Sequence, residues 1–451
     1  MSDQSVTEMS PERYKMARRA TITSSLGTAM EWIDFTAYGA LAATVFPIIF
    51  FPAADPTTAL IASFATFGVG YGARPLGAII FGYIGDRWGR KNLLMFTLIL
   101  MGVVSLIMAV LPTYQQIGIW APALLVSLRL LQGMALGGEA SGAQILTVEH
   151  APRDKRGIYG AYTQIGNPGS QLICNALLAI LTAVLSVEQF QSWGWRVPFL
   201  VSFALVGIGI YTRVKVAESP AFTHAKEEGA TAKRYVLRSH PGTVVRLLLM
   251  WGGVTVASLT TTAFAVSYAT KNLGMTYNHV FLALMVATGL GIIPLLFGGR
   301  ISDRIGRRKT VIIGTAALLV AWIPFFPLVS TANIVLVGLG MTLVYGGTQF
   351  MVGVLPILFA EPFPTDVRYS GSALAYTGSQ LVFGAPAPLI ATLLFTSAGV
   401  TGVAIFVGAC IVLSIAMALI TPETRGRDLT EGTPADPASA TDGAAVTVES
   451  R

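Results

Sequence analysis

Gly82-Tyr83-Ile84-Gly85-Asp86-Arg87-Trp88-Gly89-Arg90-Lys91 lies between two long apolar runs and returns, in related form, 217 positions later (82 to 299). The second copy is Gly299-Arg300-Ile301-Ser302-Asp303-Arg304-Ile305-Gly306-Arg307-Arg308. Both keep the spacing Gly-x-x-x-Asp-Arg-x-Gly-Arg-(Lys/Arg). A second pair, 149–156 and 361–368, shares Glu, Pro, Asp and Arg at an offset of 212 (149 to 361). Two matches at nearly one offset predict two copies of one structural unit.

The composition is that of a membrane protein. Hydrophobic residues make up 53% of the chain, charged residues only 12%, and the mean hydropathy is +0.65. An ordinary soluble domain has about twice this charged share. The net charge of +7 does not indicate nucleic-acid binding, because the basic residues form short clusters between apolar runs rather than one basic face. The two cysteines, Cys174 and Cys410, lie in apolar runs, so neither a disulfide framework nor a metal site is expected.

Twelve apolar runs are long enough to cross a membrane as helices, which takes about 20 residues each. This predicts an all-α membrane protein. The expected spans are 21–48, 57–85, 91–112, 120–149, 156–186, 194–214, 242–271, 277–300, 308–329, 332–360, 367–397 and 400–421.

Lysine and arginine set the expected orientation. Apart from Arg74, Arg129, Arg196 and Lys271, they lie in the N-terminal arm, in the C-terminal tail, or in and next to the loops after even-numbered spans. Because cytoplasmic loops are enriched in these residues, both termini are expected in the cytoplasm. The predicted parts are an arm (1–20), two six-helix bundles (21–215 and 242–421), a basic central loop (216–241) and a disordered tail (422–451).

Charged residues inside predicted spans are the first candidates for a functional site, since charges are unfavourable in lipid and by default mark a transport pathway. Glu31, Asp34 and Tyr38 follow one another at helical spacing in the first span. Arg74 lies in the second span, and Arg129, Gln132 and Glu139 lie in the fourth. The alternative is a set of static ion pairs, such as Asp34 or Glu31 with Arg74, that only hold helices together.

These features together resemble the major facilitator superfamily of secondary transporters. Closer matches make the chain similar to its metabolite:proton symporter family, which includes shikimate, α-ketoglutarate, citrate and proline/betaine permeases. The residues that carry the resemblance are Glu31-Trp32-Ile33-Asp34-Phe35, Arg74-Pro75-Leu76-Gly77, Arg129-Leu130-Leu131-Gln132-Gly133, Gly138-Glu139, Trp193-Gly194-Trp195-Arg196-Val197-Pro198-Phe199 and Glu218-Ser219-Pro220-Ala221-Phe222. Ile33 departs from the family, which usually has an aromatic residue there. The resemblance implies a substrate site between two parallel halves near the membrane midplane.

Proton coupling is expected to use carboxylates, because no histidine lies in the core of a predicted span. Asp34 is the first candidate, followed by Glu31 and Glu139. Arginine suits anion recognition because its planar fork can bind a carboxylate through two hydrogen bonds. The candidate substrate-binding residues are therefore Arg74 and Arg129, with the polar residues Tyr38, Gln132, Tyr268, Tyr345, Gln349, Tyr376 and Gln380. Uncharged polar groups such as these, and Thr260, Thr261 and Thr262, are also common as contacts between membrane helices.

The duplicated turns are interpreted as gates. Ion pairs of Asp86 and Asp303 with the neighbouring bases would latch the closed cytoplasmic face, and the glycines would permit close helix approach. The alternative is that the bases only fix the topology. Glu149 and Glu361 are interpreted as structural pairs between the two halves. The candidate gating residues are Gly82, Asp86, Arg87, Gly89, Arg90, Lys91, Asp303, Arg304, Gly306, Arg307, Arg308, Glu149, Arg156, Glu361 and Arg368.

The leading hypothesis is a proton-driven importer of a small organic acid, shikimate-like or dicarboxylate-like. It would act by alternating access as a monomer in the cytoplasmic (inner) membrane, without a cofactor or metal. The alternatives are a proton/osmolyte symporter for proline or glycine betaine, a drug/proton antiporter, and a membrane signalling or scaffold protein. An enzyme is not expected, because no span contains a nucleophile with a base or a metal-binding cluster.

Overall fold

The computed structural model of the chain describes residues 25, 28–29, 32–88, 90–137, 147–148, 151–214, 239–364 and 367–427, without the side chains of 78–79, 82–94, 153, 208–214 and 369. The predicted arm, most of the predicted central loop and the tail beyond residue 427 lie outside the described residues. The same holds for Glu31, Glu139 and Glu149, for Gly89, and for the side chains of the first duplicated turn.

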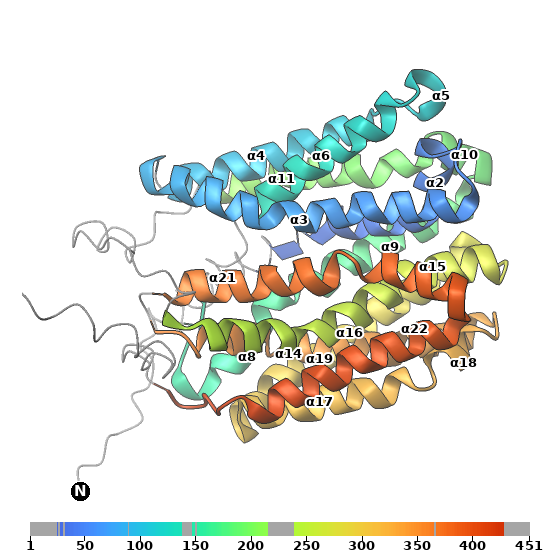
Figure 1. The fold of residues 1–451 in the computed structure, drawn as a ribbon. Coiled ribbons are helices and arrows are strands. Elements are labelled where there is room, and N and C mark those ends of the chain that lie inside the picture. The colour runs from blue at the N-terminus through green and yellow to red at the C-terminus, as the bar shows by residue number, and fades with distance from the viewer. Residues whose placement is uncertain are drawn as a thin grey trace, which may run out of the picture.

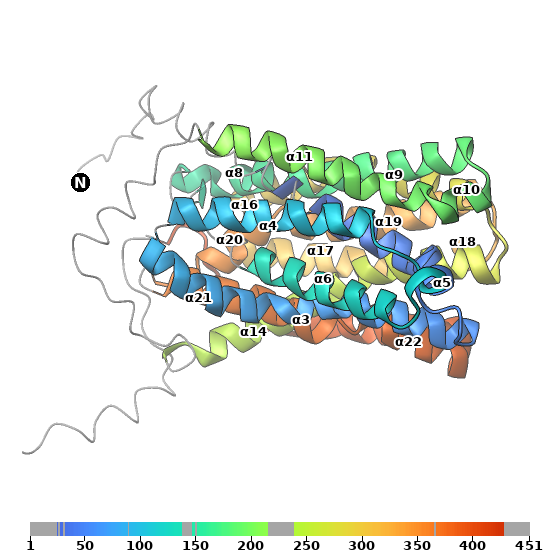
Figure 2. The same ribbon diagram turned by 90° about the horizontal axis from the view of Figure 1, so that it is seen from above.

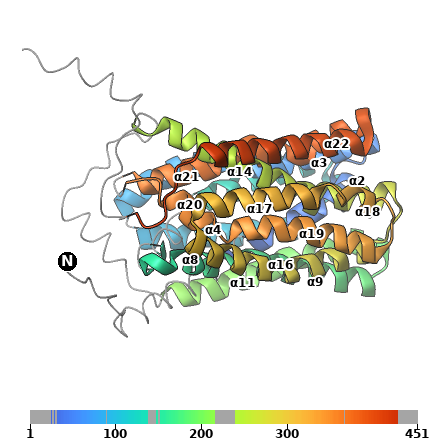
Figure 3. The same cartoon turned by 90° about the horizontal axis from the view of Figure 1, so that it is seen from below.

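The described part of the chain is helical, and its long helices lie side by side along one common axis, as Figures 1 to 3 show from three sides. No strand occurs in the described ranges. A helix satisfies its backbone hydrogen bonds internally, which a chain in hydrocarbon requires. In the first half the helical segments are 32–44, α2 (Phe46–Phe50), α3 (Pro56–Trp88), α4 (Arg90–Ala109), α5 (Tyr114–Ile117), α6 (Trp120–Gly137), η1 (Arg153–Lys155), α8 (Arg156–Gln164), α9 (Gly166–Val184), α10 (Val187–Ser192), η2 (Gly194–Arg196) and α11 (Val197–Val214).

The second half repeats this pattern with three π-helical turns, η3, η4 and η5, inserted in its helices. Its segments are α14 (Pro241–Leu259), η3 (Thr260–Phe264), α15 (Ala265–Ser267), η4 (Tyr268–Asn272), α16 (Tyr277–Ile305), α17 (Arg307–Trp322), α18 (Phe325–Val329), α19 (Ile334–Val352), α20 (Leu355–Ala360), α21 (Arg368–Ser379), η5 (Gln380–Gly384) and α22 (Ala387–Ile420).

Six helical stretches of the described chain are long and apolar enough to cross a membrane. The longest, Ser370–Ile420, is interrupted at Gly399, where φ is +64° and ψ is −160°. Glycine adopts this conformation readily because it has no Cβ. The break lies between two of the predicted spans, 367–397 and 400–421. The predicted span 156–186, in contrast, is divided into α8 and α9 at Ile165.

Close packing within each half depends on small residues. A Cβ at Gly133 of α6 would lie 2.1 Å from the Gly70 carbonyl oxygen of α3, and a Cβ at Gly77 would lie 1.9 Å from the Met134 carbonyl oxygen. Helices in lipid associate through such backbone contacts, because burial of apolar surface drives them little. In the second half, α16 packs on α19, and α14 packs on α22 and α21.

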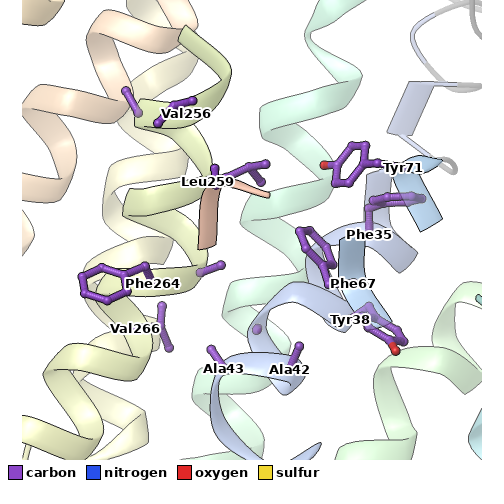
Figure 4. Close-up of a cluster of buried hydrophobic side chains, with 14 of the residues drawn as sticks. Phe35, Tyr38, Ala42, Ala43, Phe67, Tyr71, Val256, Leu259, Phe264 and Val266 are labelled. Atoms are coloured by element: carbon purple, nitrogen blue, oxygen red, sulfur yellow. The ribbon is translucent and has the colours of Figure 1, made fainter. Parts of the chain in front are cut away.

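The two halves meet along two helix contacts, α8 and α9 with α16, and α3 with α21 and η5. Buried hydrophobic side chains from both halves form one continuous core. Figure 4 shows part of it, with Phe35, Phe67 and Tyr71 on one side and Leu259 and Phe264 on the other. The end of the molecule that carries α5, α10 and α18 is called the α18 end below, and the opposite end the α20 end (Figures 1 to 3).

Candidate functional site

Asp34 lies in the helical segment 32–44 and is fully buried in the first half. Its Oδ2 accepts a hydrogen bond from the Ser105 hydroxyl of α4 and another, at 2.9 Å, from Nε2 of Gln132 in α6. Its Oδ1 has no hydrogen-bond partner among the described residues, and Ser202 of α11 lies beside the carboxyl. The carboxyl is thus held on one oxygen by donors from two other helices.

Gln132 connects Asp34 to Arg129. Its Nε2 donates to Asp34, and its Oε1 accepts a hydrogen bond from Nη1 of Arg129. All three side chains are fully buried. No salt bridge joins Asp34 to Arg129 or Arg74, three residues that the structure describes. The alternative of a static ion pair between Asp34 and Arg74 is therefore wrong for this structure. Within the described chain, Asp34 is connected to an arginine, Arg129, only through the neutral amide of Gln132.

The guanidinium groups of Arg74 and Arg129 both lie over the ring of Phe35. Their Cζ atoms are 4.4 Å and 3.9 Å from its centroid. Arg129 also lies 4.1 Å from the ring centroid of Tyr38, and Arg74 lies 4.6 Å from that of Tyr71. Nε of Arg74, and Nε and Nη2 of Arg129, have no hydrogen-bond partner within the described ranges. Contact with aromatic faces stabilises these cations but leaves donor groups available for an anion.

A small cavity, part of it open to solvent, lies next to this cluster. One wall comes from the first half and the other from α14, η3 and α16 of the second half. The lining residues are Trp32, Phe35, Thr36, Gly39, Ala40, Phe67, Tyr71, Gln171, Asn175, Ser258, Leu259, Thr262, Ala263 and Leu284. Aromatic rings, amides and hydroxyls therefore face the cavity, and the two arginines lie behind Phe35 and Tyr71.

None of the residues predicted to bind substrate is among those that line this cavity. In the first half, Tyr38 donates to or accepts from Thr66 at 2.6 Å. In the second half, the Tyr268 hydroxyl contacts Ser330 at 3.1 Å, and the Tyr376 ring packs edge to face on Phe359. Spacing along a helix shows which side chains share one face of that helix. It does not show whether that face points toward the cavity or toward a neighbouring helix.

Gln349 of α19 lies at the contact between the halves, and Tyr345 of the same helix lies against Gly291 of α16 in its own half. Gln349 donates to Asn167 of α9 at 3.4 Å, and the hydroxyl of Tyr345 is buried without a hydrogen-bond partner among the described residues. Gln380 is buried in η5, where its side chain lies against Gly384. These three predicted binding residues are therefore neighbours of the helix contacts rather than of the cavity wall.

The cavity also contains polar residues that the sequence did not single out, namely Thr36, Gln171, Asn175 and Ser258. Gln171 and Asn175 are four residues apart in α9, the same spacing that drew attention to Tyr376 and Gln380. The signal was present in the sequence, but spacing alone did not show which pair faces the space between the halves. Ser105, which contacts Asp34, gave no signal, because a single serine in an apolar helix is common.

At the α20 end, Asp303 of α16 bonds across the halves. Its Oδ1 accepts from the backbone N of Gly157 at 2.7 Å, and its Oδ2 from that of Ile158 at 3.0 Å. These are N–H groups in the first turn of α8, where the helix dipole favours a negative charge. The predicted ion pair of Asp303 with a neighbouring base is present, with Arg307 at 3.2 Å. The bonds of Asp303 to the other half are made to backbone N–H groups, which the sequence analysis did not predict.

Arg307 and Glu361 form a buried, two-pronged ion pair inside the second half. Nε and Nη2 of Arg307 donate to Glu361 at 3.1 Å and 2.9 Å. The predicted half-to-half pairing of Glu361 is therefore wrong, because its partners, Arg307 and Thr424, belong to its own half. Gly306 joins α16 to α17 with φ +99°, a conformation that favours glycine.

Three arginines of this end, Arg368, Arg308 and Arg425, donate to backbone oxygens. Arg368 donates to the carbonyl of Phe363 at 3.2 Å, Arg308 donates to that of Leu419, and the Arg304 carbonyl accepts from Arg425 at 2.7 Å.

The segment after α22, which the sequence analysis assigned to the tail, also reaches the first half. There Arg156 donates to the carbonyl of Arg427 at 2.9 Å.

The sequence profile described as Major Facilitator Superfamily matches residues 74–385. The chain is 39% identical to the inner membrane metabolite transport protein YhjE of Escherichia coli strain K12 over 424 residues, 91% of this chain and 95% of that protein. It is 37% identical to the shikimate transporter of the same strain, over 84% of this chain and 88% of the relative. It is 33% identical to that strain's proline/betaine transporter, over 93% and 86%.

Among solved structures, a proton:xylose symporter, XylE, bound to 6-bromo-6-deoxy-D-glucose superposes with a TM-score of 0.74 at 16% identity, covering 93% of this chain and 98% of that one. This likeness concerns the fold. Together with the sequence match over most of the chain, it identifies the family. The chain belongs to the major facilitator superfamily and is a multi-pass membrane transporter.

Proposed function

We propose that the protein is a proton-coupled symporter that imports a small organic acid, shikimate-like or dicarboxylate-like. The observation that carries the proposal is the buried chain Asp34–Gln132–Arg129 beside a cavity lined from both halves. Asp34 would bind the proton. Arg74 and Arg129 would supply the positive potential that attracts a carboxylate, together with the amides and hydroxyls of the cavity.

The proposed coupling is a competition for Arg129. When Asp34 is ionised, its charge is partly balanced by Arg129 through Gln132. A substrate carboxylate that draws Arg129 toward the cavity would leave Asp34 without that balance, in a fully buried position. Burial disfavours an ionised carboxylate, so proton uptake would accompany substrate binding. Ligands that favour each other's binding in this way are coupled reciprocally.

The proposed architecture has twelve spans in two six-helix bundles that rock about the cavity, with the α20 end and both termini in the cytoplasm. The protein would act as a monomer in the cytoplasmic membrane and draw its energy from the proton gradient without a cofactor. Support comes from the clustering of basic residues in loops at this end and from the relative named as an inner membrane protein.

Uptake by the purified protein in lipid vesicles tests the proposal. Radiolabelled shikimate, α-ketoglutarate and glycine betaine are offered with and without an imposed inward proton gradient. We expect the gradient to drive accumulation of one of the acids and its collapse to abolish that accumulation. Asp34→Asn removes the proton site, so it is expected to abolish concentrative uptake while leaving counterflow exchange measurable.

Asp55→Asn is the matched control, since Asp55 is an exposed carboxylate at the α18 end and bonds to Thr57 and Thr58 in the first turn of its own helix. It should accumulate substrate as the wild type does. Gradient-independent accumulation by the wild type would contradict proton coupling.

Glycine betaine is the second candidate substrate because the cavity has an aromatic wall of Trp32, Phe35, Phe67 and Tyr71, which is the type of surface that binds quaternary ammonium groups. The arginine groups over Phe35 and Tyr71 disfavour a cation at these rings. Competition decides between the two classes. If an unlabelled organic acid inhibits uptake of the labelled substrate and equimolar glycine betaine does not, the organic-acid assignment is supported. If glycine betaine inhibits and the acid does not, the osmolyte assignment is supported.

A further inference from the structure

Ser105 holds a position in which its single hydroxyl hydrogen has two alternative acceptors. Its Oγ contacts Oδ2 of Asp34 and also lies 2.9 Å from the carbonyl oxygen of Met101, four residues earlier in α4. The side chain is fully buried. A hydroxyl has one hydrogen to donate and two lone pairs that accept. The carbonyl of Met101 can only accept, whereas Asp34 can accept when ionised and donate when protonated.

Both protonation states of Asp34 are therefore satisfied without movement of a helix. When the carboxyl is ionised, Ser105 donates to Oδ2. When a proton resides on Oδ2, that O–H donates to Ser105, whose own hydrogen turns to Met101. Gln132 has no such freedom, because its amide N–H₂ only donates and its oxygen is engaged by Arg129.

We propose that Ser105 is a positioning residue for proton coupling, a hydroxyl that reverses its hydrogen-bond direction as Asp34 gains and loses its proton. The inference rests on the proposed role of Asp34. It names the hydrogen-bond partner that holds this carboxyl in the same position in its ionised and protonated states. Among the described residues, the other groups facing Asp34 are Gln132 and, through it, Arg129 from α6, Ser202 from α11 and Cys174 from α9.

The two hydrogen bonds differ in strength, and this difference gives a measurable effect. A bond donated to an ionised carboxylate is roughly twice as strong as one between neutral groups. Ser105→Ala removes both, so the ionised state loses more. The pH midpoint of Asp34 protonation should consequently move upward by about one pH unit, because a hydrogen bond to a charged group contributes more than one between neutral groups. Ser105→Thr keeps a hydroxyl and should bring the midpoint back toward the wild-type value.

Difference infrared spectroscopy of the full chain in lipid vesicles measures this directly, with protons as the only ligand. The carboxyl band that Asp34→Asn abolishes is followed through a pH titration in the wild type, Ser105→Ala and Ser105→Thr. Ser127→Ala is the control. Ser127 makes the same bond to a backbone carbonyl four residues earlier, but in α6 and exposed.

An upward shift in Ser105→Ala, its reversal in Ser105→Thr and an unchanged midpoint in Ser127→Ala are the expected results. An unchanged midpoint in Ser105→Ala would overturn the role of Ser105 while leaving Asp34 as the proton site. If Asp34→Asn removed no titrating band, the proposed function would fail as well, so the two failures are distinguishable. Shikimate uptake against external pH, measured in the same vesicles, should show the same displacement.

Discussion

At the scale of single residues, Gln132 determines how charge is arranged in the first half. An amide between a carboxylate and a guanidinium has a fixed polarity, with its N–H₂ toward Asp34 and its oxygen toward Arg129. A direct buried ion pair would be difficult to separate, because both charges lose water on burial. Through an amide, each charge keeps a hydrogen bond while either partner changes state.

Gln132→Leu tests this arrangement with little change in volume. It leaves Arg129 Nη1 without its acceptor and Asp34 without one of its donors, both in a fully buried site. We expect the free energy of unfolding to fall by about 1–3 kcal/mol for the unsatisfied groups, and proton-driven uptake to fall at least about tenfold. Thermal unfolding in detergent and vesicle uptake measure the two effects. Gln115→Leu, at an exposed position of α5, should change neither, and normal coupling in Gln132→Leu would show that the amide is dispensable.

The sequence singles out Asp34, Arg74 and Arg129 as candidates, because charges inside apolar runs are rare enough to stand out. It could not show that the two arginines share the Phe35 ring, or that Gln132 stands between Asp34 and Arg129. Those contacts join residues from three helices, and their geometry depends on helix rotation, which no spacing in one helix determines. Ser105 gave no signal, because a single serine in an apolar helix is common.

At the scale of elements, α3 and α6 are held at backbone contact by glycine. Gly133→Ala would place a Cβ 2.1 Å from the carbonyl oxygen of Gly70 and 2.9 Å from the Cβ of Ala73. The helices would have to separate, so we expect destabilisation of about 1–3 kcal/mol, as for other overpacked sites. Gly169→Ala in α9 is the control, because a Cβ there meets nothing within 4 Å. Thermal melting should show a lower midpoint for the first variant and an equal or higher one for the second.

Helix boundaries were largely predictable because apolar runs have clear ends at charged or turn-forming residues. The interruptions of the helices were less predictable. Gly399 separates two predicted spans, and Gly166 and Pro168 follow the division at Ile165. The π-helical turns of η3, η4 and η5 had no clear sequence signal. A π-helical turn is a local adjustment to packing, and packing partners from distant parts of the chain decide where it occurs.

Glu423 caps the start of α17 and makes a pH-dependent contribution to stability. Burial raises the pKa of this carboxyl, but hydrogen bonds from the backbone N–H groups of Arg425, Arg307, Arg308 and Thr424 outweigh burial and lower the pKa below its ordinary value. The contribution is therefore present above the unfolded-state pKa and lost as the pH falls through the folded-state pKa. We expect Glu423→Gln to melt below the wild type at neutral pH and the difference to shrink on acidification. A difference that stays constant with pH would contradict this cap.

At the scale of the whole molecule, contacts between the halves occur at both ends. At the α18 end, Asn278 of α16 donates to the carbonyl of Ala179 in α9 at 2.8 Å, and the rings of Phe190 and Tyr277 pack together. At the α20 end, Asp303 caps α8. Alternating access requires that one set of contacts opens while the other holds. The relative strength of the two sets therefore sets the population of each state.

Asp303→Asn is expected to shift this balance toward a molecule that is open at the α20 end. An asparagine side chain has one acceptor oxygen, and its N–H₂ cannot accept the second backbone N–H of α8. Loss of one charge-assisted bond, about 1.5–3 kcal/mol, corresponds to a shift of the equilibrium by roughly tenfold or more. Spin labels at the exposed positions Tyr162 of α8 and Ile313 of α17, with Cys174 and Cys410 replaced by Ala, report the distance between the halves at this end.

The distance distribution of Asp303→Asn should gain a longer component relative to the labelled parent. Asp55→Asn changes a carboxylate that also accepts two backbone N–H groups at a helix start, but within one half and at the α18 end. Asp55→Asn should leave the distance distribution unchanged, because the cap that it alters has the same chemistry but does not connect the two halves. If both variants gave the parental distribution, the cap between Asp303 and α8 would hold the ends of these helices without governing which face of the transporter is closed.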